Sequence, residues 1–514
     1  MDVLFLHVPK FSNYYKPIGP YSFVLYPPMG LFGLADYLIK NERSARIVHL
    51  AVEQAQSGRL DVRRIIEEHN PSIVGLDLHW HFQSYDVIEV ARKIKLHHPN
   101  VGILLGGITA SYFAEEILTD YPFVDFVIRG DAELPLLELV RQFASTQTYR
   151  EVPNLAYREG SWTVLNPITF VADRALLDRL CFTDFTLMKD YPRFVSGFSR
   201  HLRVRGISET LQNLILGRQK GYPVVMGRGC QYECSFCGGS NAAHGLHGGR
   251  RQVTLRSPET VVSSLVDLER FGFDAADLVL DSFPAIEPDD LFLPVFEEVK
   301  RRGLALNLEV DSTFLPSSRF IESFRGLPGK KSFLTLSPHS QDEELRRKNR
   351  LFRYSNQALE DCLDELERQG VNFLLCFTCG LPFETREHLV EMARYQRRLR
   401  KKYSRMRLKT SMIEIEPGSD MSRHPDRYEI EPKRTRFAEY YRYHSQPRQN
   451  HWLEMGYTRR NDPDHKEVEK FFCTHFCERF KAGRASPLIC SAVNTLGKTG
   501  LIQVLDAFFA GRKA

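Results

Sequence analysis

The sequence predicts an α/β protein with two parallel-sheet domains and a mostly helical C-terminal region. In residues 1–145, short apolar runs suited to buried strands alternate with segments whose apolar residues recur at helical spacing. From about residue 201, six further strand-like runs are each separated by a segment of helical length. Alternation of this kind is typical of parallel sheets covered by helices. The composition agrees, because 43% hydrophobic and 26% charged residues are ordinary values for a globular protein.

The first domain, residues 1–145, is predicted to be a doubly wound, Rossmann-like sheet. Its first strand covers residues 3–8, and a helix at 30–40 follows a loop. The later strands are expected at 45–51, 72–78, 101–107 and 123–129, with helices at 60–69, 85–97, 110–120 and 134–143. In such sheets ligands bind beyond the carboxyl ends of the strands.

The second domain, residues 201–430, is predicted to be a partial barrel of six β/α units. Its strands are expected at 223–229, 276–282, 304–311, 332–337, 372–380 and 407–415, with helices such as 258–270 and 355–369 between them. Residues 146–200 are less regular and are predicted to be a linker packed between the domains. The region 431–514 is rich in Tyr, Arg and His and is predicted to be mostly helical.

Charge and hydropathy exclude several classes of protein. The net charge of +5 is a weak excess that demands no nucleic acid or other polyanionic partner. No run reaches the ~18 apolar residues of a membrane span, and the opening MDVLFLHVPK lacks the features of a signal peptide. Ten cysteines in 514 residues are too few for a disulfide scaffold. We therefore expect a cytoplasmic protein whose clustered cysteines serve metal or redox chemistry.

Three cysteines lie close together directly after the first predicted barrel strand. Cys230, Cys234 and Cys237 have CxxxCxxC spacing within GCQYECSFCGG. Three thiolates on one loop suit an iron–sulfur cluster that keeps one iron open, whereas zinc normally needs a fourth nearby ligand. A structural zinc loop with a distant ligand remains the alternative. The position at the carboxyl end of a barrel strand favours an active site.

This loop resembles the signature of the radical S-adenosylmethionine (radical SAM) superfamily, with Phe236 as the aromatic residue before the last cysteine. The resemblance continues at 278–284, 337–350, 379–388 and 413–421, which look like the family's second, fourth, fifth and sixth strands with their following segments. It implies a [4Fe-4S] cluster whose open iron binds S-adenosylmethionine, and a 5'-deoxyadenosyl radical that takes hydrogen from the substrate.

The same resemblance suggests residues that contact S-adenosylmethionine. The glycine-rich GGE-like turn of many members is replaced by Asp281, Ser282 and Phe283, and Asp281 is a candidate for the amino group. For Ser337, Ser340 and Arg350, an ordinary role as a polar residue at a strand end or in a helix is an equally good explanation. The full set of candidates is Phe236, Asp281, Ser337, Ser340, Arg350 and Gly380.

The N-terminal domain resembles the cobalamin-binding domain that precedes one large branch of this superfamily. The resemblance rests on PPMGLFGLADYL at 27–38, the glycine pair at 106–107 and RGDAE at 129–133. It implies cobalamin at the carboxyl edge of the sheet, with glycines that allow close approach of its nucleotide tail. The candidate cobalamin-binding residues are Gly106, Gly107, Gly130, Glu133, His79 and His81. Because the DxHxxG motif of a lower-face ligand is absent, we expect cobalamin to bind without a histidine on cobalt.

Three further features have alternative interpretations. Cys473 and Cys477 could ligate an auxiliary cluster, but a buried reduced pair is the favoured interpretation. Cys376 and Cys379 should point to opposite faces of a strand, so a shared metal is disfavoured and one thiol could face the barrel lumen. The basic run 394–409 could suggest RNA, although a solvated helix face explains it more simply.

The leading hypothesis is therefore a cobalamin-dependent radical SAM methyltransferase of the class B type. It would methylate an unactivated carbon of a small-molecule or peptide substrate through methylcobalamin and the 5'-deoxyadenosyl radical. The resemblance also implies a reductant protein such as flavodoxin or ferredoxin. The alternatives are a radical SAM cyclase, oxidoreductase or rearrangement enzyme, and a non-catalytic cobalamin-responsive or electron-carrying protein.

Overall fold

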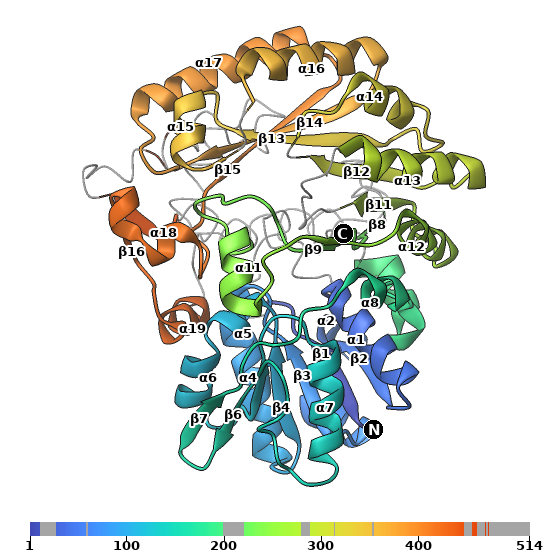
Figure 1. The fold of residues 1–514 in the computed structure, drawn as a ribbon, viewed down its shortest axis with the longest axis vertical. Helices are drawn as coiled ribbons and strands as arrows, with labels where there is room; N and C mark the ends of the chain where they lie inside the picture. Colours follow the sequence, from blue (N-terminus) through green and yellow to red (C-terminus); the bar gives the residue numbers. More distant parts are fainter. Residues whose placement is uncertain are drawn as a thin grey trace, which may run out of the picture.

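A computed structural model gives the fold of most of the chain. It describes residues 1–10, 27–57, 60–198, 220–278, 288–312, 314–351, 354–446 and 455–459, together with Val468 and Phe471. Two α/β bodies are stacked on one another, the first in blue and teal and the second in green to orange (Figure 1). The predicted fold class, with two parallel-sheet domains in this order, is confirmed.

The first body is a seven-stranded sheet with the strand order β2-β1-β3-β4-β5-β6-β7. Its strands are β1 (Val3–His7), β2 (Ala45–His49), β3 (Ile73–Asp77), β4 (Gly102–Gly106), β5 (Phe126–Ile128), β6 (Leu155–Glu159) and β7 (Trp162–Leu165). The strands β1 to β5 are parallel, and β6 and β7 add to them in antiparallel pairs. Residues 155–165, which we expected in the linker, therefore extend the first sheet.

Alternating side chains on β1 enter two different apolar cores, as expected of a sheet that is covered on both faces. Val3 and Phe5 share a core with α1 (Met29–Lys40) and α7 (Glu133–Phe143). Leu4 and Leu6 share the other core with helices of the opposite face. The helices of this body besides α1 and α7 are α2 (Leu50–Ser57), α3 (Val62–His69), α4 (Ser84–His97), α5 (Ile108–Tyr112) and α6 (Ala114–Asp120).

The rest of the predicted linker consists of short helical segments between the two bodies. They are α8 (Arg174–Arg179), η3 (Phe185–Leu187), α9 (Tyr191–Arg193) and η4 (Phe194–Phe198). The Phe185 ring packs edge-on against Tyr222 of the second body, with the ring centroids 4.9 Å apart. This segment therefore packs against the second body through apolar side chains.

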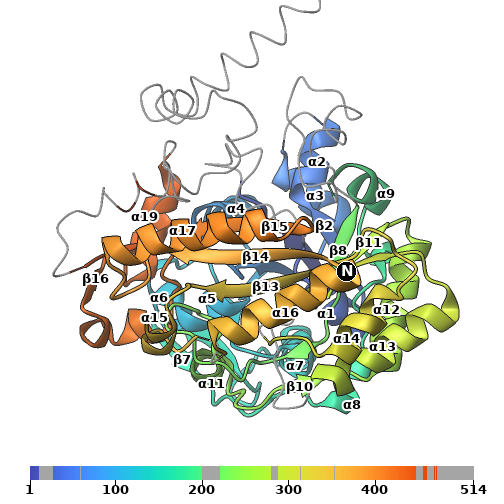
Figure 2. The same cartoon turned by 90° about the horizontal axis from the view of Figure 1, so that it is seen from above.

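The second body is built on six parallel strands in the order β15-β14-β13-β12-β11-β8. The strands are β8 (Gly221–Pro223), β11 (Ala275–Leu278), β12 (Asn307–Ser312), β13 (Phe333–His339), β14 (Asn372–Cys379) and β15 (Met406–Met412). The helices are α11 (Asn241–Gly248), α12 (Pro258–Arg270), α13 (Pro288–Arg302), α14 (Ser318–Arg325), α15 (Glu343–Lys348), α16 (Asn356–Gln369) and α17 (Arg386–Lys402). Seen from above, α16 and α17 lie along the sheet on the side away from the first body (Figure 2).

The first barrel strand begins earlier than we predicted. The backbone pairs in the sheet at β8, before most of the predicted strand 223–229. Gly227–Arg228 instead forms β9, which pairs antiparallel with β10 (Thr254–Leu255). The cysteine loop therefore starts and returns at a small two-stranded sheet.

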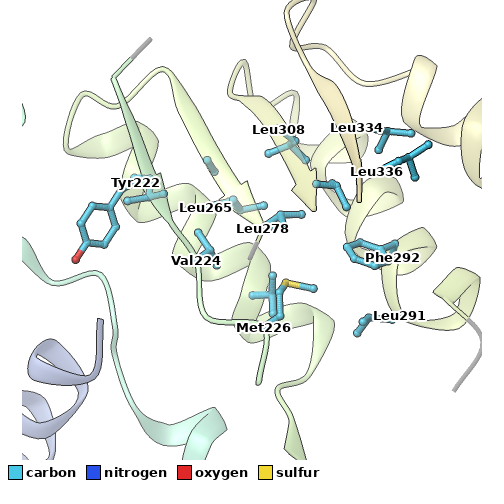
Figure 3. Close-up of a cluster of buried hydrophobic side chains, with 14 of the residues drawn as sticks. Tyr222, Val224, Met226, Leu265, Leu278, Leu291, Phe292, Leu308, Leu334 and Leu336 are labelled. Atoms are coloured by element: carbon cyan, nitrogen blue, oxygen red, sulfur yellow. The ribbon is translucent and has the colours of Figure 1, made fainter. Parts of the chain in front are cut away.

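The strands of the second body share a core of buried apolar side chains with the helices that cover them. Its members include Tyr222, Val224, Leu278, Leu308 and Leu334 (Figure 3).

The described part of the C-terminal region links both bodies. It contains α18 (Asp420–Arg423), η5 (Pro425–Tyr428), β16 (Ile430–Pro432), α19 (Phe437–Ser445) and β17 (Tyr457–Arg459). β16 and β17 form an antiparallel pair, and α19 packs against α4 of the first body. Among the described helices, none combines the length and apolarity that a transmembrane span requires.

Candidate active site

The three cysteines of the predicted cluster site lie on one turn-rich loop between β9 and α11. Backbone N–H groups of this loop point at the sulfur atoms: Tyr232 N donates to Cys230 Sγ at 3.4 Å, and Gly239 N donates to Cys237 Sγ at 3.3 Å. Donors of this kind stabilise thiolate sulfur, and they also favour sulfur that is bound to iron. The loop conformation is therefore suited to deprotonated cysteines.

The thiols of this loop are close enough to influence one another. Burial raises the pKa of Cys234 to about 12, and the neighbouring Cys230 thiol adds to the effect. Burial also raises the pKa of Cys237 well above its ordinary value, with further contributions from Glu416, Cys234 and Cys230. Three partly buried thiols with acidic neighbours need positive charge before they can ionise together. Cluster iron would supply that charge, so the donor set fits the expected group.

Within the described ranges, no three His, Cys, Asp or Glu side chains converge as ligands for a single metal ion. A [4Fe-4S] cluster does not require such convergence, because each thiolate binds a different iron. The cluster assignment of Cys230, Cys234 and Cys237 stays a prediction.

Two other loops fix the cysteine loop in place. Ser235 is fully buried, and its hydroxyl bonds Asn349 Oδ1 at 3.1 Å, at the end of α15. The backbone N of Met421 donates to Ser235 O at 2.9 Å, and Gly238 N donates to Glu416 Oε2 at 2.6 Å. The segments after β13 and β15 therefore both meet the cysteine loop at the carboxyl ends of the barrel strands. Glu416 lies within the resembling segment 413–421, but the sequence analysis did not single it out.

Phe236 lies against a histidine that we did not predict as part of the site. Its ring is 5.7 Å from the His339 ring, in an edge-on arrangement. His339 ends β13 with a positive φ of 60°, and its Nδ1 is 2.9 Å from the Thr378 hydroxyl. Burial lowers the pKa of His339 to about 4, and the nearby Arg346 acts in the same direction. His339 is therefore a neutral imidazole beside the cysteine loop.

Ser337 and Ser340 have different surroundings. Ser337 lies on the inner face of β13, and its hydroxyl hydrogen-bonds with the Cys376 thiol on the neighbouring strand. Ser340 is buried, and its Oγ accepts a hydrogen bond from Asp342 N at 3.1 Å, just before α15 begins. Ser340 therefore shapes the turn into α15, and Ser337 borders the barrel interior.

Arg350 and Gly380 are each engaged with another part of the second body. Arg350 Nη1 lies 3.4 Å from Asp420 Oδ2 of α18. Gly380 has a φ of +90°, and its N–H donates to Glu384 Oε2 at 2.6 Å. Its carbonyl accepts a hydrogen bond from the Tyr457 hydroxyl of β17. Asp281 lies outside the described residues, so its predicted role cannot be placed in this geometry.

The inner face of the barrel carries polar and charged side chains. Alternation along β14 places Cys376 on this face, whereas Cys379 is fully buried, which confirms the prediction that the two point in different directions. Burial raises the pKa of Cys376 to about 11, although Lys409, its partner in the register with β15, acts against this. By the same alternation, the polar residues on this face also include Asp277, Glu309, Asp311, Thr335 and Ser337.

At the first sheet, the glycine pair leaves room at a strand end. No heavy atom of the described residues lies within 4 Å of the position that a Cβ of Gly106 would take. Gly107 has a φ of +107°, and a Cβ there would meet the Cα of His79 at 2.7 Å. The carboxyl end of β4 is therefore open beside Gly106 and tightly packed beside Gly107. An open strand end beside Gly106 is compatible with a ligand at this edge, where the cobalamin prediction places one.

The two histidines after β3 differ in their surroundings. The His79 ring packs edge-on against Trp80 with the centroids 4.6 Å apart. His81 is 3% exposed, its Nδ1 is 3.3 Å from His444 Nε2 of α19, and its Nε2 is 3.7 Å from Glu414 Oε1 after β15. Burial lowers the pKa of His81 well below its ordinary value, and positive charge nearby adds to this. Both ring nitrogens of His81 thus face residues of the C-terminal half of the chain.

Gly130 and Glu133 lie where the two bodies meet. Glu133 is fully buried and forms a two-point ion pair with Arg228, with Oε1 2.6 Å from Nη2 and Oε2 3.1 Å from Nη1. Gly130 faces Gly248 at the end of α11. Cys473 and Cys477 lie outside the described residues. The sequence analysis gave no signal for Arg228 as a partner of the RGDAE segment, because the pairing depends on how the two bodies are stacked.

Comparisons with known proteins agree with this arrangement. Residues 21–140 match the B12 binding domain family, and residues 224–395 match the radical SAM superfamily. An uncharacterized methyltransferase, PH0819, of Pyrococcus horikoshii is 23% identical over 420 residues, which cover 80% of this chain and 81% of that protein. The hopanoid C-3 methylase of Methylococcus capsulatus is 23% identical over 257 residues, covering 50% of this chain and 43% of the methylase.

Two solved structures share the fold. The radical S-adenosylmethionine methyltransferase TsrM from Kitasatospora setae, with cobalamin and a [4Fe-4S] cluster bound, has a TM-score of 0.60 at 15% identity and covers 92% of this chain and 88% of its own. The cobalamin-dependent S-adenosylmethionine radical enzyme OxsB, with aqua-cobalamin and S-adenosylmethionine bound, has a TM-score of 0.55 at 15% identity and covers 77% of this chain and 52% of its own.

Proposed function

Because the chain joins a B12 binding domain to a radical SAM domain, it belongs to the cobalamin-binding radical SAM enzymes, and we propose that it methylates its substrate. The substrate would be a small molecule or peptide with an unactivated carbon as the methyl acceptor. When bound, the cluster and S-adenosylmethionine supply a radical that activates the substrate, and cobalamin supplies the methyl group.

One observation carries this proposal: the segment before the cysteine loop is joined directly to the cobalamin-binding domain. Arg228 lies two residues before Cys230 and pairs with Glu133 of the first body at 2.6 Å. Methyl transfer to a substrate radical needs the substrate between the two cofactors, and precise placement of reacting groups is a large part of such catalysis. A contact between the two cofactor domains beside the cysteine loop supports that arrangement.

The residues proposed to hold the cofactors follow from the site geometry. Cys230, Cys234 and Cys237 would hold the cluster. Phe236, with the His339 ring against it, would border S-adenosylmethionine. The predicted role of Gly380 is not supported, because a Cβ there would meet Met455 and Ile413, so the missing side chain makes room for these residues and not for a ligand. On the first body, cobalamin would lie at the carboxyl end of β4, where the position beside Gly106 is open among the described residues.

Polar side chains that face the barrel interior have hydrogen-bonding partners of their own, as a site for a reactive intermediate requires. His339 Nδ1 lies 2.9 Å from the buried Thr378 hydroxyl, and the Cys376 thiol hydrogen-bonds with the half-buried Ser337. Radical chemistry requires that water and stray hydrogen donors be excluded from such a site. A reductant protein such as flavodoxin or ferredoxin would deliver the electron to the cluster, and this proposal places the enzyme in the cytoplasm.

The relatives favour methyl transfer over the alternatives. Besides the hopanoid methylase, a relative named cobalamin-dependent radical SAM methyltransferase TokK, of Streptomyces tokunonensis, is 27% identical over 173 residues. A different chemistry remains the second candidate, because the anaerobic magnesium-protoporphyrin IX monomethyl ester cyclase of Cereibacter sphaeroides is 24% identical over 223 residues.

Product analysis separates these candidates. The anaerobically reconstituted protein would be incubated with methyl-deuterated S-adenosylmethionine, a reductant and a candidate substrate, with Cys230→Ala as the control. Formation of both 5'-deoxyadenosine and S-adenosylhomocysteine, together with a deuteromethylated product, supports the proposal. 5'-Deoxyadenosine without S-adenosylhomocysteine would indicate the cyclase, oxidoreductase or rearrangement alternative. Absence of both would indicate a non-catalytic protein.

A further inference from the structure

Four charged side chains form a buried cluster between the two bodies. Asp131 and Glu133 come from the first body, and Arg228 and Arg250 come from the two ends of the cysteine loop. The cluster is electrically balanced, and we call it the interdomain charge cluster. Both Glu133 and Arg250 are at most 5% exposed. Charges this deeply buried are retained only when each is paired.

Every oxygen of the two carboxylates is engaged. Glu133 takes both of its bonds from Arg228, at 2.6 and 3.1 Å. Asp131 Oδ1 accepts from Arg228 Nη1 at 2.9 Å, while Oδ2 accepts from Arg250 and from Ala172 N. Burial raises the pKa of Asp131, but the two guanidinium groups outweigh it and hold the pKa below its ordinary value. Bidentate arginine pairs of this kind fix orientation as well as distance.

The cluster closes the base of the cysteine loop. Arg228 belongs to β9, where the loop leaves, and Arg250 precedes β10, where the loop returns. Arg250 also donates to the Ala172 carbonyl at 2.8 Å and to the Thr254 hydroxyl at 2.5 Å. Asp131 therefore holds both ends of the loop that carries Cys230, Cys234 and Cys237.

A backbone contact lies beside the charge cluster. A Cβ on Gly130 would lie 2.9 Å from the carbonyl oxygen of Gly248, and a Cβ on Gly248 would lie 2.8 Å from Gly130 Cα. Contacts this short are possible only between glycines. The end of α11 thus rests directly on the RGDAE segment, and α11 lies between the two bodies beside α5 (Figure 1).

We propose that Asp131 and Glu133 are positioning residues that hold the cysteine loop at a fixed distance from the cobalamin-binding sheet, with Gly130 as the contact that permits this approach. They would act through Arg228 and Arg250 and not by touching cobalamin. This proposal replaces the cobalamin-binding role that we expected for Gly130 and Glu133. The expected effect on methylation rests on the proposed function, whereas the expected effect on the position of the cysteine loop does not.

Two pairs of variants test this proposal in the full-length protein with its cluster reconstituted. Glu133→Gln keeps the side-chain shape but removes the charge. Glu159→Gln is its control, because Glu159 of β6 forms an exposed ion pair with Arg150 in the same body. Gly130→Ala introduces a Cβ against Gly248. Gly160→Ala is its control, because Gly160 also has a positive φ (63°) but nothing within 4 Å of the Cβ position.

The first readout is hydrogen exchange of the backbone amides in residues 229–256. We expect exchange to be at least about tenfold faster in Glu133→Gln and Gly130→Ala and unchanged in both controls, because local opening follows the loss of buried contacts. Unchanged exchange in Glu133→Gln would overturn the proposal. This isosteric variant decides the matter if Gly130→Ala does not fold. The measurement needs neither cobalamin nor turnover.

The second readout is the magnetic coupling between cob(II)alamin and the reduced cluster in electron paramagnetic resonance. We expect a narrow distribution of distances between cobalt and the iron–sulfur cluster in the wild-type protein. This distribution should broaden in Glu133→Gln, while the iron–sulfur cluster and cobalamin contents stay the same. Methylated product per 5'-deoxyadenosine should fall with it. A distribution as narrow as that of Glu159→Gln would overturn the positioning role. A wild-type protein without methylation would count against the proposed function alone. The hydrogen-exchange and distance measurements would still test the positioning role of the interdomain charge cluster.

Discussion

Individual residues of the site are defined by burial and by their immediate neighbours. The cysteine loop shows this clearly, because burial and the mutual proximity of the thiols raise the pKa values of Cys234 and Cys237. His81 shows it in the opposite direction, since burial lowers the pKa of its imidazole. At this scale the predictions concern the metal ligands, the lower face of cobalt and one buried carboxyl group.

Replacing Cys230, Cys234 and Cys237 together with Ala should abolish cluster assembly, because no other three described cysteines lie on one loop. Iron analysis and the visible charge-transfer absorption of the anaerobically reconstituted protein measure this. Cys362→Ala, at a buried position in the α16 helix, is the control and should keep its iron. Near-stoichiometric cluster iron in the triple variant would contradict the assignment.

Cobalamin should bind without a histidine nitrogen on cobalt, since His81 is engaged with His444 and faces Glu414. The electron paramagnetic resonance spectrum of bound cob(II)alamin should therefore lack nitrogen superhyperfine splitting. The comparison with His79→Ala and His81→Ala makes the test specific. Splitting in the wild-type spectrum that disappears in either variant would show that a histidine is the ligand.

Glu384 should make stability depend on pH. Burial raises the pKa of this carboxyl to about 7, against the opposing effect of Arg459. The folded protein therefore binds a proton that the unfolded chain releases near pH 4.5, so stability falls as the pH rises between about 4.5 and 7, by up to about 3 kcal/mol. Glu384→Gln, which mimics the protonated form, should lose this dependence.

Thermal unfolding midpoints at pH 5 and pH 8 measure the effect. Relative to the wild type, the unfolding midpoint of Glu384→Gln should be higher at pH 8 than it is at pH 5. The control is Glu387→Gln, at an exposed position in the first turn of α17, three residues after Glu384. An equal difference at both pH values would show that Glu384 titrates normally.

At the scale of elements, α19 has a larger structural role than the sequence analysis suggested. There the region 431–514 was predicted only to be mostly helical. In the structure, Phe437 and Tyr440 of α19 belong to the core of the first body. Deletion of 431–514 would therefore expose that core, and point substitutions in α19 are the better test.

Tyr440→Ala should destabilise the first body by about 3 kcal/mol, because it leaves a cavity where a nearly fully buried ring packs against Phe113 and His81. Arg442→Ala, on the exposed side of the same helix, should change stability little. Chemical unfolding followed by circular dichroism compares the two variants. Equal stability of both would mean that α19 is not part of the core in solution.

For the whole molecule, the two bodies share one continuous apolar core. Phe32 of α1 and Tyr222 of β8 pack edge-on with their ring centroids 6.3 Å apart, and the Tyr222 hydroxyl donates to Pro27 O at 2.9 Å. Large apolar contacts between domains oppose independent motion. Together with the interdomain charge cluster, this packing predicts that the two bodies unfold together.

Calorimetry of the protein should therefore show one main unfolding transition. A shared core couples the two bodies, so neither gains by unfolding alone. Glu133→Gln should lower the temperature of that transition or split it, whereas Glu159→Gln should leave it unchanged. Two well-separated transitions in the wild-type protein would show that the bodies are independent.

The sequence by itself determined most of the elements and predicted the chemistry of the cysteine loop. Helices such as 258–270 were predicted at their observed bounds, since periodicity and capping residues are local properties. The spacing of Cys230, Cys234 and Cys237 likewise predicted a cluster site without any structure. The glycine pair at 106–107 pointed to a strand end with room for a ligand.

Only the tertiary structure decided which distant residues meet. The RGDAE segment reads as a cofactor motif in the sequence, yet Glu133 faces Arg228, 95 residues away. The strands 155–165 were placed in a linker because antiparallel pairing with β5 depends on a neighbour that local patterns do not reveal. The surroundings of His81, with His444 and Glu414, were equally hidden, because burial between two bodies is a property of their packing and not of the residues alone.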